Sequence, residues 1–338
     1  MNSSRLIDEN ISIEFETQKI QTPSSMNRLI INFLVFSSLY FALNACQKTK
    51  CSIDDDPVVY LSIDSLSTIY TDGQQFTSGI EGPAVDKENN LYAVNFEKEG
   101  TIGKITSSGK SSIFLTLPDS AIGNGIRFYD SKMYVADYNG HRIFEFLEDG
   151  TSSVYSRNTN MNQPNDLAMA HNGQIFCSDP NFNDGTGSIW TVSRDDQKLI
   201  QIKSSLGTTN GIELSPDDKY LYVNESNTLQ VLRYEIDWSI SPVSLTNETV
   251  FHVFLDGGVD GMRCDQEGNL YIARITSQEV AVLSPEGEQI HSVKLIGKNP
   301  TNVAFGGVDG KTVYVTVKDS RNIEQFHTSV SGRSLLIP

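Results

Sequence analysis

The feature that most constrains this chain is an internal repeat. Six segments share one pattern, in which a polar residue, usually followed by glycine, leads an alternating strand, a polar turn and a second, aromatic-containing strand. They begin at Glu81, Asn124, Asn165, Asn210, Asp260 and Thr301, so the starts are 43, 41, 45, 50 and 41 residues apart. Units of this length hold four short strands and no long helix. The repeat therefore predicts an all-β fold, a six-bladed β-propeller of four-stranded antiparallel blades around a central channel.

Turn residues and apolar spacing inside each unit agree with this fold. The segments DKENN, HNGQ, SPDDK, DQEGN and GGVDGK contain the Gly, Asn and Asp that tight hairpins require, so each is expected to join strands one and two. Asp265 and Glu267 of DQEGN are accordingly expected to be solvated. Apolar residues with period two, such as Ile212 and Leu214, are expected to pack between blades. Cys177 and Cys264 alternate with apolar neighbours and are predicted to be buried thiols.

The charge of the chain narrows the class of partner. Its 26 basic and 42 acidic residues give a formal net charge of -16. Such a surface repels a nucleic-acid backbone unless a local basic stripe exists, and the sequence contains no such stripe. We therefore expect no nucleic-acid partner, whereas cations would be attracted to the acidic surface.

An export signal precedes the repeats. After Met26 come a basic residue, Arg28, an apolar run at 29–43 and small residues before Cys46. A retained membrane anchor is the alternative, although the run is short for a membrane span. The segment LNAC resembles the bacterial lipobox, which implies a lipid anchor on Cys46 and an exported lipoprotein of the outer membrane, facing the periplasm or the cell surface.

Four segments follow from this interpretation. Residues 1–25 are expected to be a gene-model extension, 26–46 a lipoprotein-type signal peptide, 47–60 a tether and 61–338 the propeller domain. The acidic cluster at 54–56 resembles the tether of bacterial surface lipoproteins, and its alternative interpretation is an ordinary solvated linker. The sequence sets no oligomeric state.

The repeat also predicts a site. The innermost strand of each blade lines the channel, so residues at the same repeat position form a ring around one axis. All six leading residues carry side-chain oxygen, and two of them, Glu81 and Asp260, are carboxylates. Oxygen atoms that converge on one point are what a hard divalent cation such as Ca²⁺ requires. The alternative is that Asn and Asp only cap the strand turns before glycine.

A second ring is expected at the same mouth. If strand two runs antiparallel to strand one, its last residue returns to the start of strand one. These positions are Asn95, Asp137, Asp179, Glu225, Arg274 and Val317. We predict that Asp137, Asp179 and Arg274, together with Asn124 of the first ring, bind substrate. The alternative is that the second ring consists of ordinary solvated strand ends.

Several motifs resemble a known family. QPNDLAM at 163–169, NGIELSPDDKYLYV at 210–223, DGMRCDQEGNLYIAR at 260–274 and NPTNVAFGGVDGKTVYVT at 299–316 are similar to the SMP-30/gluconolactonase/LRE-like proteins. The resemblance spans about residues 78–320. It implies a six-bladed propeller with a divalent metal, commonly calcium, held at the channel mouth by Glu81, Asn210 and Asp260, with Asn165 beside them as ligand or substrate contact. Gln163 stands where the animal branch has arginine, which leaves the particular sugar lactone open.

A mechanism follows as a hypothesis. Ca²⁺ held by Glu81, Asn165, Asn210 and Asp260 would polarise the carbonyl of a small-molecule lactone, and Asp260 would act as general base or as nucleophile. The five histidines occupy none of the ring positions, and the sequence contains no GxSxG segment to supply a serine nucleophile. Two alternative functions share this scaffold: another metal-assisted ester or organophosphate hydrolase, and a non-catalytic ligand-binding propeller.

Overall fold

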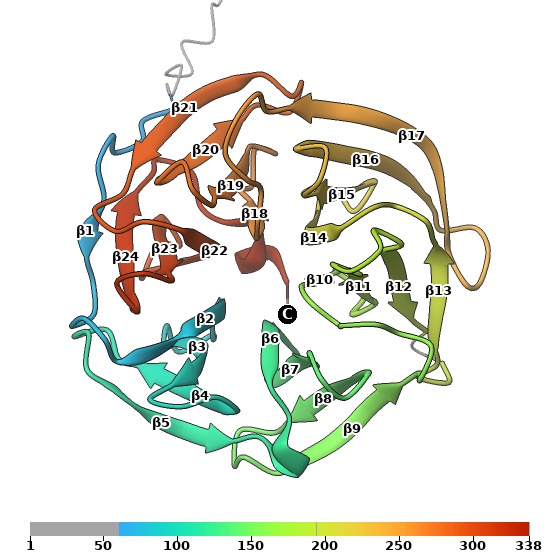
Figure 1. Ribbon diagram of the computed structural model, residues 1–338, viewed down its shortest axis with the longest axis horizontal. Coiled ribbons are helices and arrows are strands. Elements are labelled where there is room, and N and C mark those ends of the chain that lie inside the picture. The colour runs from blue at the N-terminus through green and yellow to red at the C-terminus, as the bar shows by residue number, and fades with distance from the viewer. Residues whose placement is uncertain (1–60, 194, 338) are drawn as a thin grey trace, which may run out of the picture. The chain divides into compact units, whose positions relative to one another are not determined.

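Six four-stranded antiparallel sheets are arranged radially around one axis (Figure 1). The computed structural model describes residues 61–193 and 195–337. The six-bladed propeller predicted from the repeat is therefore confirmed. The predicted extension, the signal peptide with Cys46 and the tether lie outside the described residues.

In blades 1 to 5 the four strands follow one another in the chain from the axis outward. Blade 1 consists of β2 (Phe76–Val85), β3 (Leu91–Phe96), β4 (Thr101–Ile105) and β5 (Ser111–Thr116), and the 3-10 helix η1 (Pro118–Ser120) leads to blade 2, which consists of β6 (Gly123–Tyr129), β7 (Lys132–Asp137), β8 (Arg142–Phe146) and β9 (Ser152–Arg157). Blade 3 consists of β10 (Leu167–Met169), β11 (Ile175–Asp179), β12 (Ser188–Val192) and β13 (Leu199–Lys203), and blade 4 of β14 (Thr209–Leu214), β15 (Tyr220–Glu225), β16 (Gln230–Asp237) and β17 (Ser244–Val253). Blade 5 consists of β18 (Met262–Cys264), β19 (Leu270–Arg274), β20 (Glu279–Leu283) and β21 (Gln289–Lys294).

The sixth blade combines both ends of the described chain. It contains β22 (Pro300–Gly306), β23 (Thr312–Val317) and β24 (Asn322–His327), and its outermost strand is β1 (Thr68–Ile69). Thr68 pairs with Gln325, and the hydroxyl of Ser67 donates to the buried carboxylate of Glu324. The first strand therefore closes the ring by completing the last sheet.

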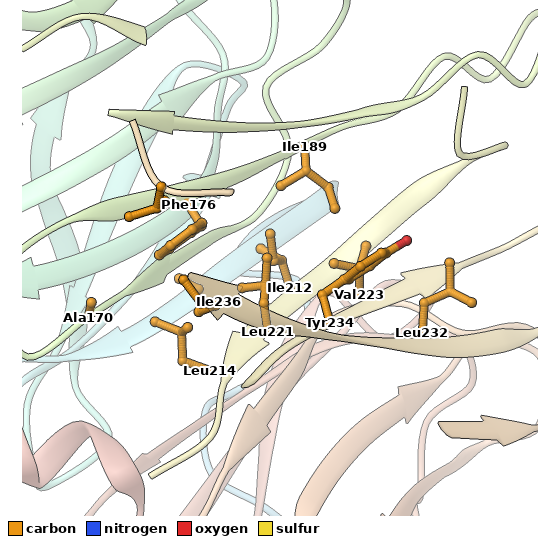
Figure 2. Packing of buried hydrophobic residues seen from close by; sticks show 12 residues of the cluster. Ala170, Phe176, Ile189, Ile212, Leu214, Leu221, Val223, Leu232, Tyr234 and Ile236 are labelled. Carbon is orange, nitrogen blue, oxygen red and sulfur yellow. The ribbon is translucent and has the colours of Figure 1, made fainter. Parts of the chain in front are cut away.

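Apolar clusters lie between neighbouring blades rather than at a single centre. Each of six buried clusters joins residues of two adjacent blades. Figure 2 shows one of them, in which Ile212 and Leu214 of blade 4 pack against Ala170 and Phe176 of blade 3. The prediction that period-two apolar faces pack between blades is confirmed. Cys177 and Cys264 are also buried free thiols, as predicted.

The predicted hairpin turns are present, but one expectation about them is wrong. Asp265 is fully buried, and its Oδ1 accepts hydrogen bonds from the backbone N–H groups of Glu267, at 3.0 Å, and Asn269, at 2.9 Å. Its backbone pairs with Gly332, so the C-terminal segment covers the turn. Burial raises the pKa of this carboxyl. Asp265 thus stabilises the turn by accepting hydrogen bonds from its backbone, whereas Glu267 is exposed as expected.

A C-terminal segment covers one end of the channel. The 3-10 helix η2 (Arg333–Leu336) lies near the axis (Figure 1). Arg333 is buried there, and it donates from Nε to the Ser215 carbonyl at 2.8 Å and from Nη1 to the Met169 carbonyl at 2.9 Å. Those carbonyls lie where the inner strands β14 and β10 end, so η2 marks the channel end opposite the ring of leading residues. Neither 3-10 helix of the described residues is long and apolar enough to span a membrane.

Candidate metal centre

Breaks in strand pairing place the leading residues at the channel mouth. The register shifts between Gly123 and Ile126, between Thr209 and Ile212, and between Pro300 and Asn302. Asn124, Asn210 and Thr301 fall within these breaks, and the β2–β3 register shifts on both sides of Glu81. A bulge leaves a residue outside the ladder and turns its side chain in a new direction. Asn165 and Asp260 instead lie just before β10 and β18.

The glycine that follows most leading residues has a steric cause. Gly82 has φ of +58°, and a Cβ atom there would lie 1.9 Å from the carbonyl oxygen of Asn124 in the next blade. A Cβ atom at Gly211 would lie 2.3 Å from the carbonyl oxygen of Asp260. Inner strands therefore approach one another at the mouth more closely than a side chain allows. This approach brings leading residues of neighbouring blades together.

A row of amides connects four of the leading residues. Asn124 Nδ2 donates to Asn165 Oδ1, Asn165 Nδ2 donates to Asn210 Oδ1 at 2.9 Å, and the Asn210 side chain is hydrogen-bonded to Asp260. Each amide oxygen in this row has a second lone pair. Thr301 differs, because its hydroxyl donates to the Ile80 carbonyl at 2.9 Å. The structure therefore brings together the predicted residues Asn165, Asn210 and Asp260, with Asn124 at the end of the row.

Glu81 completes the group from blade 1. Its Oε2 accepts hydrogen bonds from the backbone N–H of Gly82 at 2.9 Å and from Asn302 Nδ2 at 3.0 Å. Burial, followed by the negative charge of Asp166, raises the pKa of Glu81 to about 7, against the opposing effect of these two donors. Glu81 is therefore fixed through one oxygen, and its ionised form is destabilised by its surroundings.

Asp260 is destabilised in the same way. Burial raises the pKa of its carboxyl well above the usual range, and the charges of Glu81 and Asp166 raise it further, whereas the hydrogen bond from Asn210 opposes them. Among the ion pairs of residues 61–193 and 195–337, none involves Glu81 or Asp260. Arg263 and Lys318 attract Glu81 and Asp260 only from a distance, so a cation bound between the two carboxylates would lower their repulsion.

The donor set fits a hard divalent cation such as Ca²⁺. It offers carboxylate oxygens from Glu81 and Asp260 and amide oxygens from Asn165 and Asn210, which are oxygen ligands that Ca²⁺ accepts. The described part of the chain has no cluster of three or more His, Cys, Asp or Glu residues able to hold a metal ion. A cation at this mouth would therefore depend on the amide oxygens as well as on the two carboxylates.

The side chains of the second ring are buried and bind neighbouring side chains and loop backbone. Buried Asp137 accepts from Arg142 Nε at 2.7 Å, and buried Asp179 accepts from Trp190 Nε1 at 2.9 Å and from the backbone N–H of Gln163 at 2.6 Å. Arg274 is also buried; its Nε donates to the Gly258 carbonyl at 3.0 Å, and its guanidinium carbon lies 3.6 Å from the ring centre of Phe254. Since all three side chains are buried, the interpretation as solvated strand ends is wrong. Their contact with substrate stays a prediction.

Replacing Asp137 with asparagine separates the two roles. Arg142 would lose its buried charge partner, so we expect the free energy of unfolding to fall by about 1–2 kcal/mol, and KM for substrate to rise as well where Asp137 contacts substrate as predicted. Denaturant unfolding and steady-state kinetics measure the two quantities. Asp119→Asn is the matched control, because Asp119 is the exposed partner of the same arginine, with 71% of its side chain accessible. A raised KM with unchanged stability would instead assign Asp137 to substrate binding alone.

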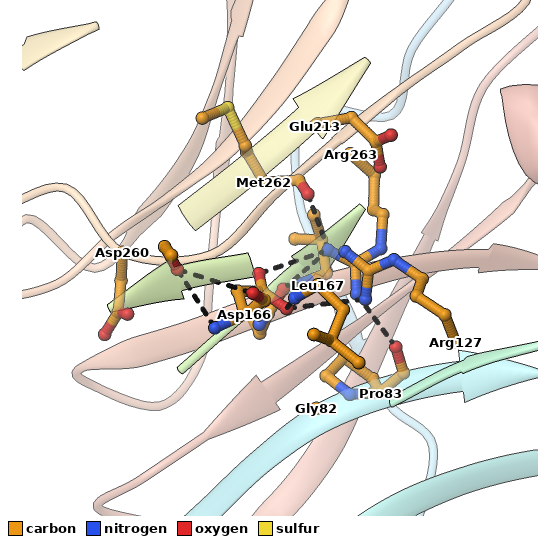
Figure 3. A network of polar contacts seen from close by, with 12 residues as sticks. Gly82, Pro83, Arg127, Asp166, Leu167, Glu213, Asp260, Met262 and Arg263 are labelled. Atoms are coloured by element: carbon orange, nitrogen blue, oxygen red, sulfur yellow. Dashed lines mark hydrogen bonds and ion pairs between the residues drawn. The ribbon is translucent and has the colours of Figure 1, made fainter. Parts of the chain in front are cut away.

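Sequence reasoning missed a charged layer below the ring. Asp166 and Asn302 stand where other repeats have glycine, and Asn302 Nδ2 donates to Asp166 Oδ2 at 3.1 Å as well as to Glu81. Figure 3 shows the guanidinium groups of Arg127 and Arg263 beside Asp166, to which they are 3.4 and 3.5 Å distant. The sequence contained a signal for this layer, because the two repeats that lack glycine after the leading residue have Asp166 and Asn302 there, and these are the side chains that reach it.

The comparisons with known proteins agree with the fold and with the resemblance. The chain is 26% identical over 265 residues to the "Putative sugar lactone lactonase YvrE" of Bacillus subtilis, covering 72% of this chain and 85% of that protein. It is 27% identical over 316 residues to the "Gluconolactonase" of Zymomonas mobilis, covering 80% and 85%. A solved structure of a calcium-binding protein, regucalcin, from Agrobacterium tumefaciens has a TM-score of 0.68 at 21% identity, covering 80% of this chain and 95% of that one.

A family model gives the assignment. The description of that model is "SMP-30/Gluconolactonase/LRE-like region", and it matches residues 80–319, which include all six leading residues and all six inner strands apart from the first residues of β2. The predicted family is therefore confirmed, and this chain belongs to the SMP-30/gluconolactonase/LRE-like family.

Proposed function

We propose that this protein is a divalent-metal-dependent hydrolase that opens a sugar lactone, with Ca²⁺ as the metal. The observation that carries the proposal is the pair of carboxylates at one channel mouth, Glu81 and Asp260, which form no ion pair with another described residue and stand beside a row of amide oxygens. The distant lactonase relatives support the reaction class.

The residues that would hold the cation are Glu81, Asn165, Asn210 and Asp260. When bound, the cation would polarise the lactone carbonyl and neutralise negative charge that develops on its oxygen. The chain itself provides the orientation. Glu81 is fixed by Gly82 and Asn302, and the hydrogen-bonded row fixes which way the Asn165 and Asn210 amides point.

Asp260 would handle the proton. In the general-base route its carboxylate accepts a proton from water as the water oxygen bonds to the acyl carbon; the ring C–O bond then breaks and the ring oxygen takes up a proton, which gives an aldonate. In the nucleophilic route the carboxylate itself bonds to the acyl carbon as the ring C–O bond breaks and the ring oxygen takes up a proton. Water then cleaves the resulting anhydride, which releases the aldonate and regenerates the Asp260 carboxylate. The hydrogen bond from Asn210 favours the ionised form of Asp260 that both routes need.

A chelator-controlled panel of lactones tests the proposal. Protein supplied with Ca²⁺ is expected to accelerate the opening of gluconolactone or another aldonolactone above the spontaneous rate, followed by the release of acid. EDTA should remove this activity and excess Ca²⁺ should restore it, because the cation would polarise the lactone carbonyl. An aryl ester and a phosphate triester serve as substrates of the other hydrolase class. If metal-supplied protein opened no lactone of the panel, the proposed function would be wrong.

A further inference from the structure

A large pocket lies at the channel end opposite the metal centre. Its volume is about 880 Å³, which is in the range of sites for small organic molecules. It is lined by the turns that follow the inner strands β2, β6 and β22, and by residues of η2 such as Ser334 and Leu335. Asp166 and Asn302 separate the pocket from the metal centre, since Asn302 Nδ2 donates to both Asp166 and Glu81.

Aromatic rings form one wall of this pocket. Tyr92 and Phe114 of blade 1 and Phe128 and Phe146 of blade 2 all line it. The ring of Tyr92 lies 5.1 Å from that of Phe114 and 5.4 Å from that of Phe128. Such a wall favours a ligand with an apolar or aromatic body, because burial of that body removes apolar surface from water.

Two arginines form the floor. Arg127 is only 8% exposed, and its Nη2 is buried without a hydrogen-bond partner, whereas its Nη1 donates to the Ile126 carbonyl at 2.8 Å. Arg263 lies beside it and also lines the pocket (Figure 3). A buried guanidinium N–H without a partner is costly, so a ligand acceptor at this position would be favourable.

The acidic groups that compensate the two floor arginines lie outside the pocket. Asp166 is shared between Arg127 and Arg263 at 3.4 and 3.5 Å, distances longer than the roughly 2.7–2.9 Å of a strong charge-assisted hydrogen bond. Glu213 of β14 also attracts Arg127 electrostatically, but neither Asp166 nor Glu213 lines the pocket. Burial, followed by repulsion from Arg263, lowers the pKa of Arg127 to about 10, so the side chain is still a cation at neutral pH.

We propose that this pocket is a second binding site, for a small organic monocarboxylate with an apolar, aromatic body. Its carboxylate would accept from Arg127 Nη2 and Arg263 at the floor, and its body would lie against the wall formed by Phe114 and Phe128. A planar guanidinium matches the two oxygens of a carboxylate. Charges of both signs also line the pocket: Lys87 pairs with Glu148 at 3.0 Å and with Glu88 at 3.7 Å.

Benzoate and its neutral analogue benzamide are the probes. Binding to the full protein is measured by isothermal titration calorimetry in EDTA, so that no metal at the opposite mouth can attract the carboxylate. We expect saturable binding of benzoate and at least about tenfold weaker binding of benzamide, because the charge-assisted contacts are lost. Arg127→Gln should weaken benzoate binding by about tenfold as well. Arg157→Gln, which removes an exposed arginine of the outer strand β9, should leave it unchanged.

Three results would overturn the site: no saturable binding of benzoate to the wild-type protein, equal affinity for benzamide, or unchanged affinity in folded Arg127→Gln. Circular dichroism shows whether that variant folds. Phe114→Ala provides an independent test if it does not, since Phe114 is a half-buried residue of the outer strand β5. Benzoate should bind this variant severalfold more weakly, and unchanged affinity would exclude the aromatic wall as a ligand contact. The test does not depend on lactonase activity, so its failure and that of the proposed function are distinguishable.

Discussion

Replacing Asp260 with asparagine is expected to lower kcat/KM for lactone opening by about 10³-fold. General-base catalysis alone contributes about 10²–10⁴-fold, and the substitution also removes one of the two carboxylates that would hold the cation. The change corresponds to roughly 4 kcal/mol in transition-state free energy. Steady-state kinetics on the best lactone of the panel, at saturating Ca²⁺, measures the loss. Saturating metal ensures that a weaker affinity for Ca²⁺ does not by itself account for it.

A second carboxylate on the other side of β18 provides the control for this variant. Glu267→Gln removes a carboxylate seven residues further along the chain, from an exposed position in the turn after β18, and should leave kcat/KM unchanged. Asp260→Asn is also expected to unfold no more readily than wild type in EDTA, because it removes a carboxylate whose ionised form is destabilised by burial and by Glu81. An active Asp260→Asn variant would exclude both the general-base and the nucleophilic role.

Addition of Ca²⁺ is expected to stabilise the protein strongly at neutral pH. A ligand at 100 times its Kd that binds only the folded state raises the free energy of unfolding by about 2.7 kcal/mol. For a chain of this length that corresponds to a rise in Tm of roughly 5 °C. Thermal unfolding in EDTA and in Ca²⁺ measures the difference. Glu81→Gln should lose most of it, whereas Glu267→Gln should keep it.

The metal-free protein should also show a characteristic pH dependence. The folded-state pKa of Glu81 is raised from 4.5 to about 7, so between these values the folded state binds more protons than the unfolded state. Stability is therefore greatest below about pH 4.5 with respect to this group and falls as the pH rises through 7. Glu81→Gln should flatten this decline in EDTA. A decline of the same size in the variant would show that other groups cause it.

The sequence predicted those features that repeat. Ile212 and Leu214 could be placed between blades, and Glu81, Asn165, Asn210 and Asp260 at one mouth, because strand periodicity and repeat position together determine a direction and a height in the propeller. Positions at the second ring were located correctly in the chain, but Asp137 and Asp179 turned out to be buried against loops. The contacts that bury these side chains do not follow the repeat, so the repeat could not predict them.

Features that occur once could not be predicted. Arg333 crosses the channel end because its donors meet the carbonyls of Met169 and Ser215, more than a hundred residues earlier in the chain. The burial of Asp265 follows from the same segment, since Gly332 pairs with its backbone. Both depend on where the C-terminal chain returns in space, and η2 has no counterpart among the repeats. Asp166 and Asn302 could have been noticed, as exceptions to a glycine position.

Closure of the sixth blade by β1 has a consequence for the order of folding. Thr68 and Gln325 pair across almost the whole described chain, at a separation of 257 positions in the sequence. β1 can join its sheet only once β24 is present, because β24 is the strand it pairs with. Contacts between such distant positions form slowly. Blades 1 to 5 can each pair their own strands without this contact, so the circular arrangement is expected to be completed last.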